Sequence, residues 1–122
     1  MTQGRSNTNT GAMKIILLHP IEPVRVRLAE WLEKRGHTVV CYGECPQCWD
    51  DMMNEHRPDL VFLPELDKFR YWSLFTASIY HPECQFKYTP EPPLFSATGV
   101  SAQLGSSLTE IERVHQGKLK AA

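Results

Sequence analysis

The chain has 122 residues, 42% of them hydrophobic and 22% charged, which is the composition of a small globular domain with a single core. Its 13 basic and 14 acidic residues leave a net charge of -1, a balance that favours neither nucleic acid nor a membrane surface as partner. No apolar run approaches the roughly 20 residues that span a bilayer. Because no secretory signal precedes the first apolar run, we expect a cytoplasmic protein.

The first twelve residues are polar, and a second methionine, Met13, stands directly before the first apolar run. A polar segment of this kind supplies no apolar side chains to a core. We therefore expect residues 1–12 to be a disordered tail or the remnant of an expression tag. Residues 13–122 are then expected to form one domain.

Three short apolar runs alternate with two helical patterns in the first half of the chain. Residues 14–18, 38–42 and 60–63 have the apolar character of buried strands. Residues 22–36 and 45–55 carry apolar residues at helical spacing. In the first helix the charged side chains are expected to point outward into solvent: Arg25, Arg27, Glu30 and Lys34. This β-α-β-α-β order predicts a parallel sheet with helices on both faces and right-handed crossovers.

The pattern is less regular after residue 66. Residues 67–80 predict a third helix that is rich in aromatic residues, and exposed aromatic side chains favour interfaces. Four prolines within residues 81–93 predict a loop. Residues 94–97 are expected to form a short fourth strand. A capping-box pattern from Ser107 predicts a last helix that ends at Gly117. The candidates for an interaction surface are Phe69, Tyr71, Trp72 and Phe75.

Residues 24–40 and 57–63, together with the spacing between them, resemble receiver domains, the phosphorylatable modules of bacterial two-component response regulators. The resemblance runs from residue 14 to about residue 97, and residues 93–97 are similar to the family's fourth strand, which ends in Ser or Thr followed by Ala. It implies a flavodoxin-like α/β fold, a doubly wound parallel sheet in three α/β/α layers with strand order 2-1-3-4-5. We expect the C-terminal part of this fold to be incomplete or rebuilt.

The resemblance also implies where phosphorylation chemistry would stand. A phosphorylatable receiver has an acidic pair after its first strand to hold Mg²⁺, and an aspartate after its third strand to accept the phosphoryl group. This chain has His19 and Pro20 at the first place and Pro64 at the second, and no lysine stands where the family has one after its fifth strand. Ser96 matches the family's hydroxyl residue. We interpret His19, Pro20, Pro64 and Ser96 as degenerate phosphorylation-site positions.

These departures predict a pseudo-receiver that works without phosphorylation, and that is not an enzyme and needs no metal or cofactor. The partner is expected to be another signalling protein or a second copy of the chain, in bacterial signal transduction. Neither nucleic acid nor a membrane is expected as a partner. The fold would then serve as a protein-protein interaction or dimerisation module.

The cysteines leave two alternatives open. Cys45 and Cys48 form a C-x2-C pair at the start of a predicted helix, where the helix dipole favours a thiolate, so a thiol-disulfide oxidoreductase is one alternative. His81 and Cys84 would complete a set of four ligands that zinc prefers. The predicted topology disfavours that zinc site, because it places the two pairs at opposite ends of the sheet. Reduced, unpaired thiols are the simpler interpretation.

Overall fold

The computed structural model describes residues 11–44, 46–65 and 79–121. The chain divides into two compact units, one formed by Ala12–Tyr88 and the other by Met1–Gly11 with Thr89–Ala122. No helix within the described ranges is long and apolar enough to cross a membrane.

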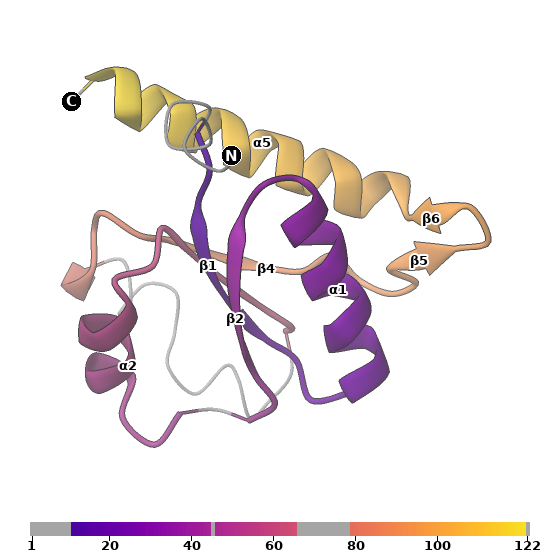
Figure 1. Ribbon diagram of the computed structural model, residues 1–122, viewed down its shortest axis with the longest axis horizontal. Coiled ribbons are helices and arrows are strands. Elements are labelled where there is room, and N and C mark those ends of the chain that lie inside the picture. Colours follow the sequence, from indigo (N-terminus) through magenta and orange to yellow (C-terminus); the bar gives the residue numbers. More distant parts are fainter. Residues whose placement is uncertain (1–10, 45, 66–78, 122) are drawn as a thin grey trace, which may run out of the picture. The chain divides into compact units, whose positions relative to one another are not determined.

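The unit Ala12–Tyr88 is built around a four-stranded parallel sheet with the order β2-β1-β3-β4. This confirms the prediction of a doubly wound parallel sheet and the 2-1-3-4 part of its strand order, although the fourth strand is Gln85–Tyr88 and not residues 94–97 (Figure 1). The elements are β1 (Lys14–Leu18), α1 (Glu22–Lys34), β2 (Thr38–Tyr42), α2 (Trp49–His56), β3 (Leu60–Leu63) and β4 (Gln85–Tyr88).

Helices α1 and α2 flank the sheet on its two sides (Figure 1). The chain moves from β1 to β2 in one direction and from β2 past β1 to β3 in the other. Right-handed crossovers in opposite directions place the connecting helices on opposite faces. The expectation of helices on both faces is therefore confirmed.

The ends of both helices follow from local residues. Gly36 follows α1 with φ at 97°, a left-handed conformation that glycine adopts without steric cost. Arg57 ends α2 with φ at 48°, and Pro58 follows it directly. Because a proline disfavours the α-helical conformation of the residue before it, the chain leaves the helix here and enters β3.

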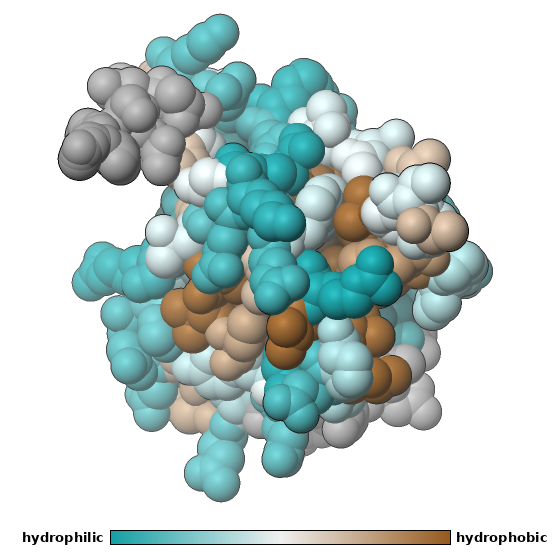
Figure 2. All heavy atoms as spheres, turned by 45° about the vertical axis from the view of Figure 1, so that its right-hand side comes forward, coloured by the Kyte–Doolittle hydropathy of each residue, from teal (hydrophilic) through white to brown (hydrophobic). Residues whose placement is uncertain are grey.

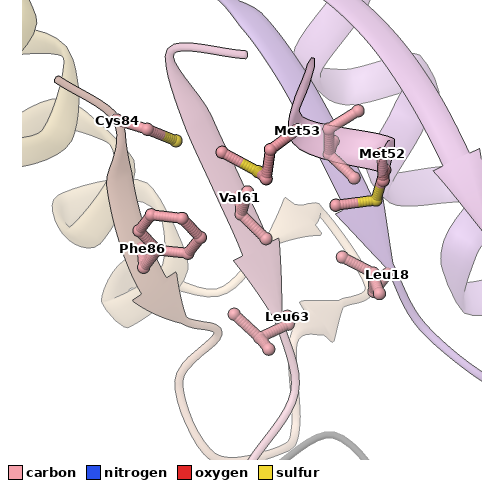
Figure 3. Close-up of a cluster of buried hydrophobic side chains, with 8 residues drawn as sticks. Leu18, Met52, Met53, Val61, Leu63, Cys84 and Phe86 are labelled. Carbon is pink, nitrogen blue, oxygen red and sulfur yellow. The ribbon is translucent and has the colours of Figure 1, made fainter. Parts of the chain in front are cut away.

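One face of the sheet is closed by a cluster of buried side chains that links α2 to three strands. Figure 3 shows Met52 and Met53 of α2 lying against Val61 of β3. Truncation of one such side chain to alanine typically costs about 2–5 kcal/mol, so this cluster is a main source of the unit's stability. The buried members are Ile16, Leu18, Met52, Met53, Val61, Leu63, Cys84 and Phe86.

The prediction of a loop over residues 81–93 is wrong in its middle, because β4 lies there and pairs with β3. Its four residues, Gln85–Tyr88, have apolar residues at alternate positions, Phe86 and Tyr88, as a strand requires. Pro82 and Pro90 stand outside β4, so neither interrupts its hydrogen bonds. The prolines therefore bound a strand here.

The second unit contains a hairpin and a helix. Residues 94–97 are not a strand of the parallel sheet: β5 (Phe95–Ser96) pairs antiparallel with β6 (Gly99–Val100). The last helix, α5 (Ala102–Ala121), is longer than predicted at both ends. It begins earlier because the Ser101 hydroxyl accepts a hydrogen bond from the Leu104 N–H at 3.1 Å, which makes Ser101 the cap in place of Ser107. Gly117 lies inside the helix and does not end it.

Candidate functional site at the carboxyl edge of the sheet

In parallel sheets of this kind, ligands bind outside the carboxyl ends of the strands. Strand β1 is followed there by His19 and Pro20, and β3 is followed there by Pro64 and Glu65. The two strands are neighbours in the sheet, so their following residues leave from the same edge. The positions that the sequence singled out on β1 and β3 are thus brought to one edge.

His19 has a structural role at this edge. It is 7% exposed, and its backbone N–H donates to the carbonyl of Tyr42 at 3.1 Å, which joins the ends of β1 and β2. Its ring Nδ1 accepts a hydrogen bond from the Ile21 N–H at 3.2 Å, just before α1, so the neutral ring carries its proton on Nε2. Burial lowers the pKa of His19, and the positive charge of Arg25 lowers it further. A neutral imidazole is a poor ligand for Mg²⁺.

The end of β3 offers no nucleophile. Pro64 is buried and its side chain is a hydrocarbon ring, so it can neither accept a phosphoryl group nor bind a cation. Glu65 is the next residue and is exposed. A buried residue followed by an exposed one places the carboxylate in solvent, away from the position that a reactive side chain would take.

Ser96, the fourth candidate position, does not follow a strand of the parallel sheet. It lies in β5, is exposed, and bonds within its own hairpin to Thr98 and Gly99. The hydroxyl residue that directly follows β4 is Thr89, which is 8% exposed. Thr89 was not predicted as a site residue, because the fourth strand was expected at residues 94–97, nine residues after its position in the structure; the alternation ending at Tyr88 was the available signal.

The opposite, amino edge of the sheet also uses ionisable side chains to bind backbone. The Asp59 carboxylate accepts a hydrogen bond from the Lys14 N–H at 2.9 Å, and the Asp59 N–H donates to the Lys14 carbonyl at 2.8 Å. The His37 ring accepts from the Met13 N–H at 3.0 Å. These contacts fix β1 to the elements on either side of it.

The described cysteines do not form a reactive pair. Cys48 is exposed and is the residue before α2, so this helix begins four residues later than the predicted start at residue 45. Cys45 lies outside the described residues. Cys84 is buried and donates from its thiol to the carbonyl of Gln85. Burial of the thiol also raises the pKa of Cys41, which stabilises the unreactive protonated form.

His81 lies beside α2. Its Nε2 is 3.3 Å from a carboxylate oxygen of Asp50, and its ring packs at a tilt against Phe86. Among the residues that the structure describes, no group of three or more His, Cys, Asp or Glu is placed to hold a metal ion. The zinc set proposed from sequence includes Cys45, which is outside those residues, so it stays a hypothesis.

The aromatic interaction candidates Phe69, Tyr71, Trp72 and Phe75 also lie outside the described residues. The last two residues of the same predicted segment are described: Ile79 is 57% exposed and Tyr80 is 68% exposed. Isolated exposed apolar residues are normal on protein surfaces, and Figure 2 shows apolar side chains among hydrophilic ones on one face. Because Ile79 and Tyr80 are both large and adjacent in sequence, they indicate a contact surface more strongly than an isolated apolar residue would.

No family model matches the sequence, and no curated protein matches it either. The fold, however, is similar to solved structures. The chain aligns over 96% of its length with 55% of the anti-anti-sigma factor PhyR from Bartonella quintana, with 10% sequence identity and a TM-score of 0.59. It aligns over 90% of its length with 29% of NtrX from Brucella abortus, with 17% identity and a TM-score of 0.53.

Both of these proteins contain receiver domains, so the resemblance recognised in the sequence is confirmed at the level of the fold. The chain spans about half of the PhyR structure and less than a third of the NtrX structure. It has a flavodoxin-like, receiver-like α/β fold.

Proposed function

We propose that this protein is a phosphorylation-independent receiver-like domain that acts by binding another signalling protein or a second copy of itself. One observation carries the proposal: the residue after β3 is a buried proline, Pro64, where phosphoryl transfer needs a nucleophile. On this proposal the domain has no catalytic chemistry of its own, and works in the cytoplasm of a bacterial cell.

The state of β1 supports the same proposal. His19 occupies the place of an acidic ligand, and burial together with the charge of Arg25 favours its neutral form. Its Nδ1 already accepts a hydrogen bond from the Ile21 N–H. A cation at this edge would meet a guanidinium group, and neither His19 nor Pro64 supplies the carboxylate that hard cations require. Both positions thus lack the residues of phosphoryl transfer, as expected for a domain that acts through contacts on its surface.

The contact surface we propose includes Ile79 and Tyr80, together with the aromatic residues that precede them in sequence. Both side chains are more than half exposed. Tyrosine supplies a large apolar area with a polar tip, which suits an interface that also meets water. The partner we propose first is a second copy, because that can be measured with the purified protein alone.

Sedimentation velocity over a range of protein concentrations tests this proposal. We expect reversible association that is unchanged by a small-molecule phosphodonor with Mg²⁺, and that is weakened in the double variant Ile79→Ser, Tyr80→Ser. Val26→Ser is the matched control, because Val26 is 46% exposed and lies on α1. A requirement for the phosphodonor would contradict phosphorylation independence, and association unaffected by the double variant would exclude this surface.

A further inference from the structure

The side chain of Arg25 departs from the expected outward orientation on α1. It is half-buried, and its Nη1 donates to the carbonyl of His19 at 2.7 Å. Hydrogen bonds from a charged donor are shorter and stronger than neutral ones. No ion pair joins Arg25 to a carboxylate within the part of the chain that the structure describes. Its charge is therefore directed at the backbone that follows β1.

The same guanidinium group lies against the backbone that follows β2. A Cβ atom added at Gly43 would stand 2.9 Å from Arg25 Nη1 and 3.4 Å from Cζ. Gly43 is not among the residues with positive φ, so its backbone conformation is open to other residues. A side chain at position 43 would therefore displace the guanidinium group, which lies at the end of a flexible side chain.

The electrostatic effects agree with this position. The charge of Arg25 lowers the pKa of His19, at the end of β1, and opposes the rise in the pKa of Cys41, on β2. The backbone bond from His19 to Tyr42 already joins the ends of these two strands. Arg25 thus lies where it can act on both connections at once.

We propose that Arg25 is a clasp that fixes the β1–α1 connection to the β2–α2 connection at the carboxyl edge of the sheet. The guanidinium group binds one connection through the His19 carbonyl and rests on the other at Gly43. It is a positioning residue: it holds these two connections in one conformation without a bound ligand. The inference does not depend on which partner the domain binds.

Amide hydrogen exchange, measured residue by residue by NMR, tests the clasp. In Arg25→Met we expect exchange to become roughly tenfold faster at His19 and Ile21, because a bond from a charged donor is lost. We also expect the amide resonance of Gly43 to shift, because the guanidinium group no longer lies against it. Lys34→Met is the matched control: it also removes one positive charge from α1, but Lys34 is exposed and far along the helix. It should leave these amides unchanged.

Gly43→Ala gives the same test from the other connection. The added Cβ should displace the guanidinium group, so the exchange at His19 and Ile21 should rise although neither residue is altered. Gly117→Ala is its control, because nothing lies within 4 Å of a Cβ at that position. If Arg25→Met fails to fold, Gly43→Ala still decides the question.

A second readout separates the clasp from a merely stabilising contact. Loss of the charge in Arg25→Met should raise the pKa of His19 in an NMR titration, and Lys34→Met should not. An unchanged Gly43 resonance in Arg25→Met, or a His19 titration unchanged by that substitution, would overturn the proposal.

Discussion

The two edges of the parallel sheet put ionisable residues to different uses. At the amino edge a carboxylate, Asp59, binds the backbone N–H of Lys14. At the carboxyl edge, β1 and β3 are followed by a neutral histidine and a buried proline, His19 and Pro64. The acidic side chain is thus kept where it ties strands together, and is missing where phosphoryl transfer would need it. The difference supports the proposal that this sheet serves as a scaffold for binding another protein.

The largest effect is expected from placing a carboxylate at the carboxyl edge. Pro64→Asp should lower the free energy of unfolding by about 3 kcal/mol, because an unpaired carboxylate would be buried. Pro64→Ala is the control, with an expected loss of about 1 kcal/mol from the greater freedom of the unfolded chain. Chemical denaturation measures both. Equal stabilities would mean that this edge accommodates a carboxylate, and the contrast between the edges would fail.

At the amino edge it is the removal of a carboxylate, and not its introduction, that should lower the stability. Asp59→Ala leaves the Lys14 N–H without its acceptor and should cost about 2 kcal/mol. Asp59→Asn retains a carbonyl oxygen that can accept the same hydrogen bond, and should cost less. Denaturation of the two variants provides the comparison. If Asn is as destabilising as Ala, the hydrogen bond is not what the carboxylate contributes.

A smaller effect concerns pH. Burial and Arg25 lower the pKa of His19 in the folded state, so below the ordinary histidine value of about 6.5 the unfolded state binds more protons. Stability should therefore be fully present above that value and should be lost as the pH falls from it toward the folded pKa. His19→Gln, which can still accept from the Ile21 N–H, should lose less stability over this window. Thermal melts at several pH values measure this. If the melting temperatures of the original protein and of His19→Gln change in parallel with pH, His19 does not contribute to the pH dependence of stability.

The smallest effect is expected at Cys48, the residue before α2, whose side chain makes no capping hydrogen bond. Cys48→Ser introduces a favoured capping hydroxyl and should raise the stability by up to about 1 kcal/mol. Self-association should be unchanged, because the proposed function uses no thiol. Loss of activity in a disulfide-reduction assay, in a variant that is otherwise folded, would instead support the oxidoreductase alternative.

The first half of the fold could be predicted because its signals are local. Apolar runs mark β1, β2 and β3, and Gly36 and Pro58 mark the ends of the helices between them. Strand β4 was missed because its signal is only four residues long and stands among prolines that indicate a loop. Ser96 was misplaced as a direct consequence, since the assigned strand was the wrong one.

The lack of acidic residues at the candidate site can be recognised from the sequence, whereas the contacts that its side chains make cannot. The missing acidic residues can be read directly at His19 and Pro64. The orientation of Arg25 cannot, because it depends on the His19 carbonyl six residues earlier and on the space above Gly43, in a connection that follows the next strand. A charged residue on a helix is by default solvated, and only the folded arrangement reveals the exception.

The central claim is that this receiver-like sheet carries no phosphorylation chemistry. Intact-mass measurement after incubation with a small-molecule phosphodonor and Mg²⁺ tests it most directly, with a phosphorylatable receiver domain treated in parallel as the positive control. We expect the control to gain the mass of one phosphoryl group and this protein to keep its original mass. A stable acyl-phosphate adduct on this chain, located by peptide mapping to a carboxylate such as Glu65, would contradict the claim.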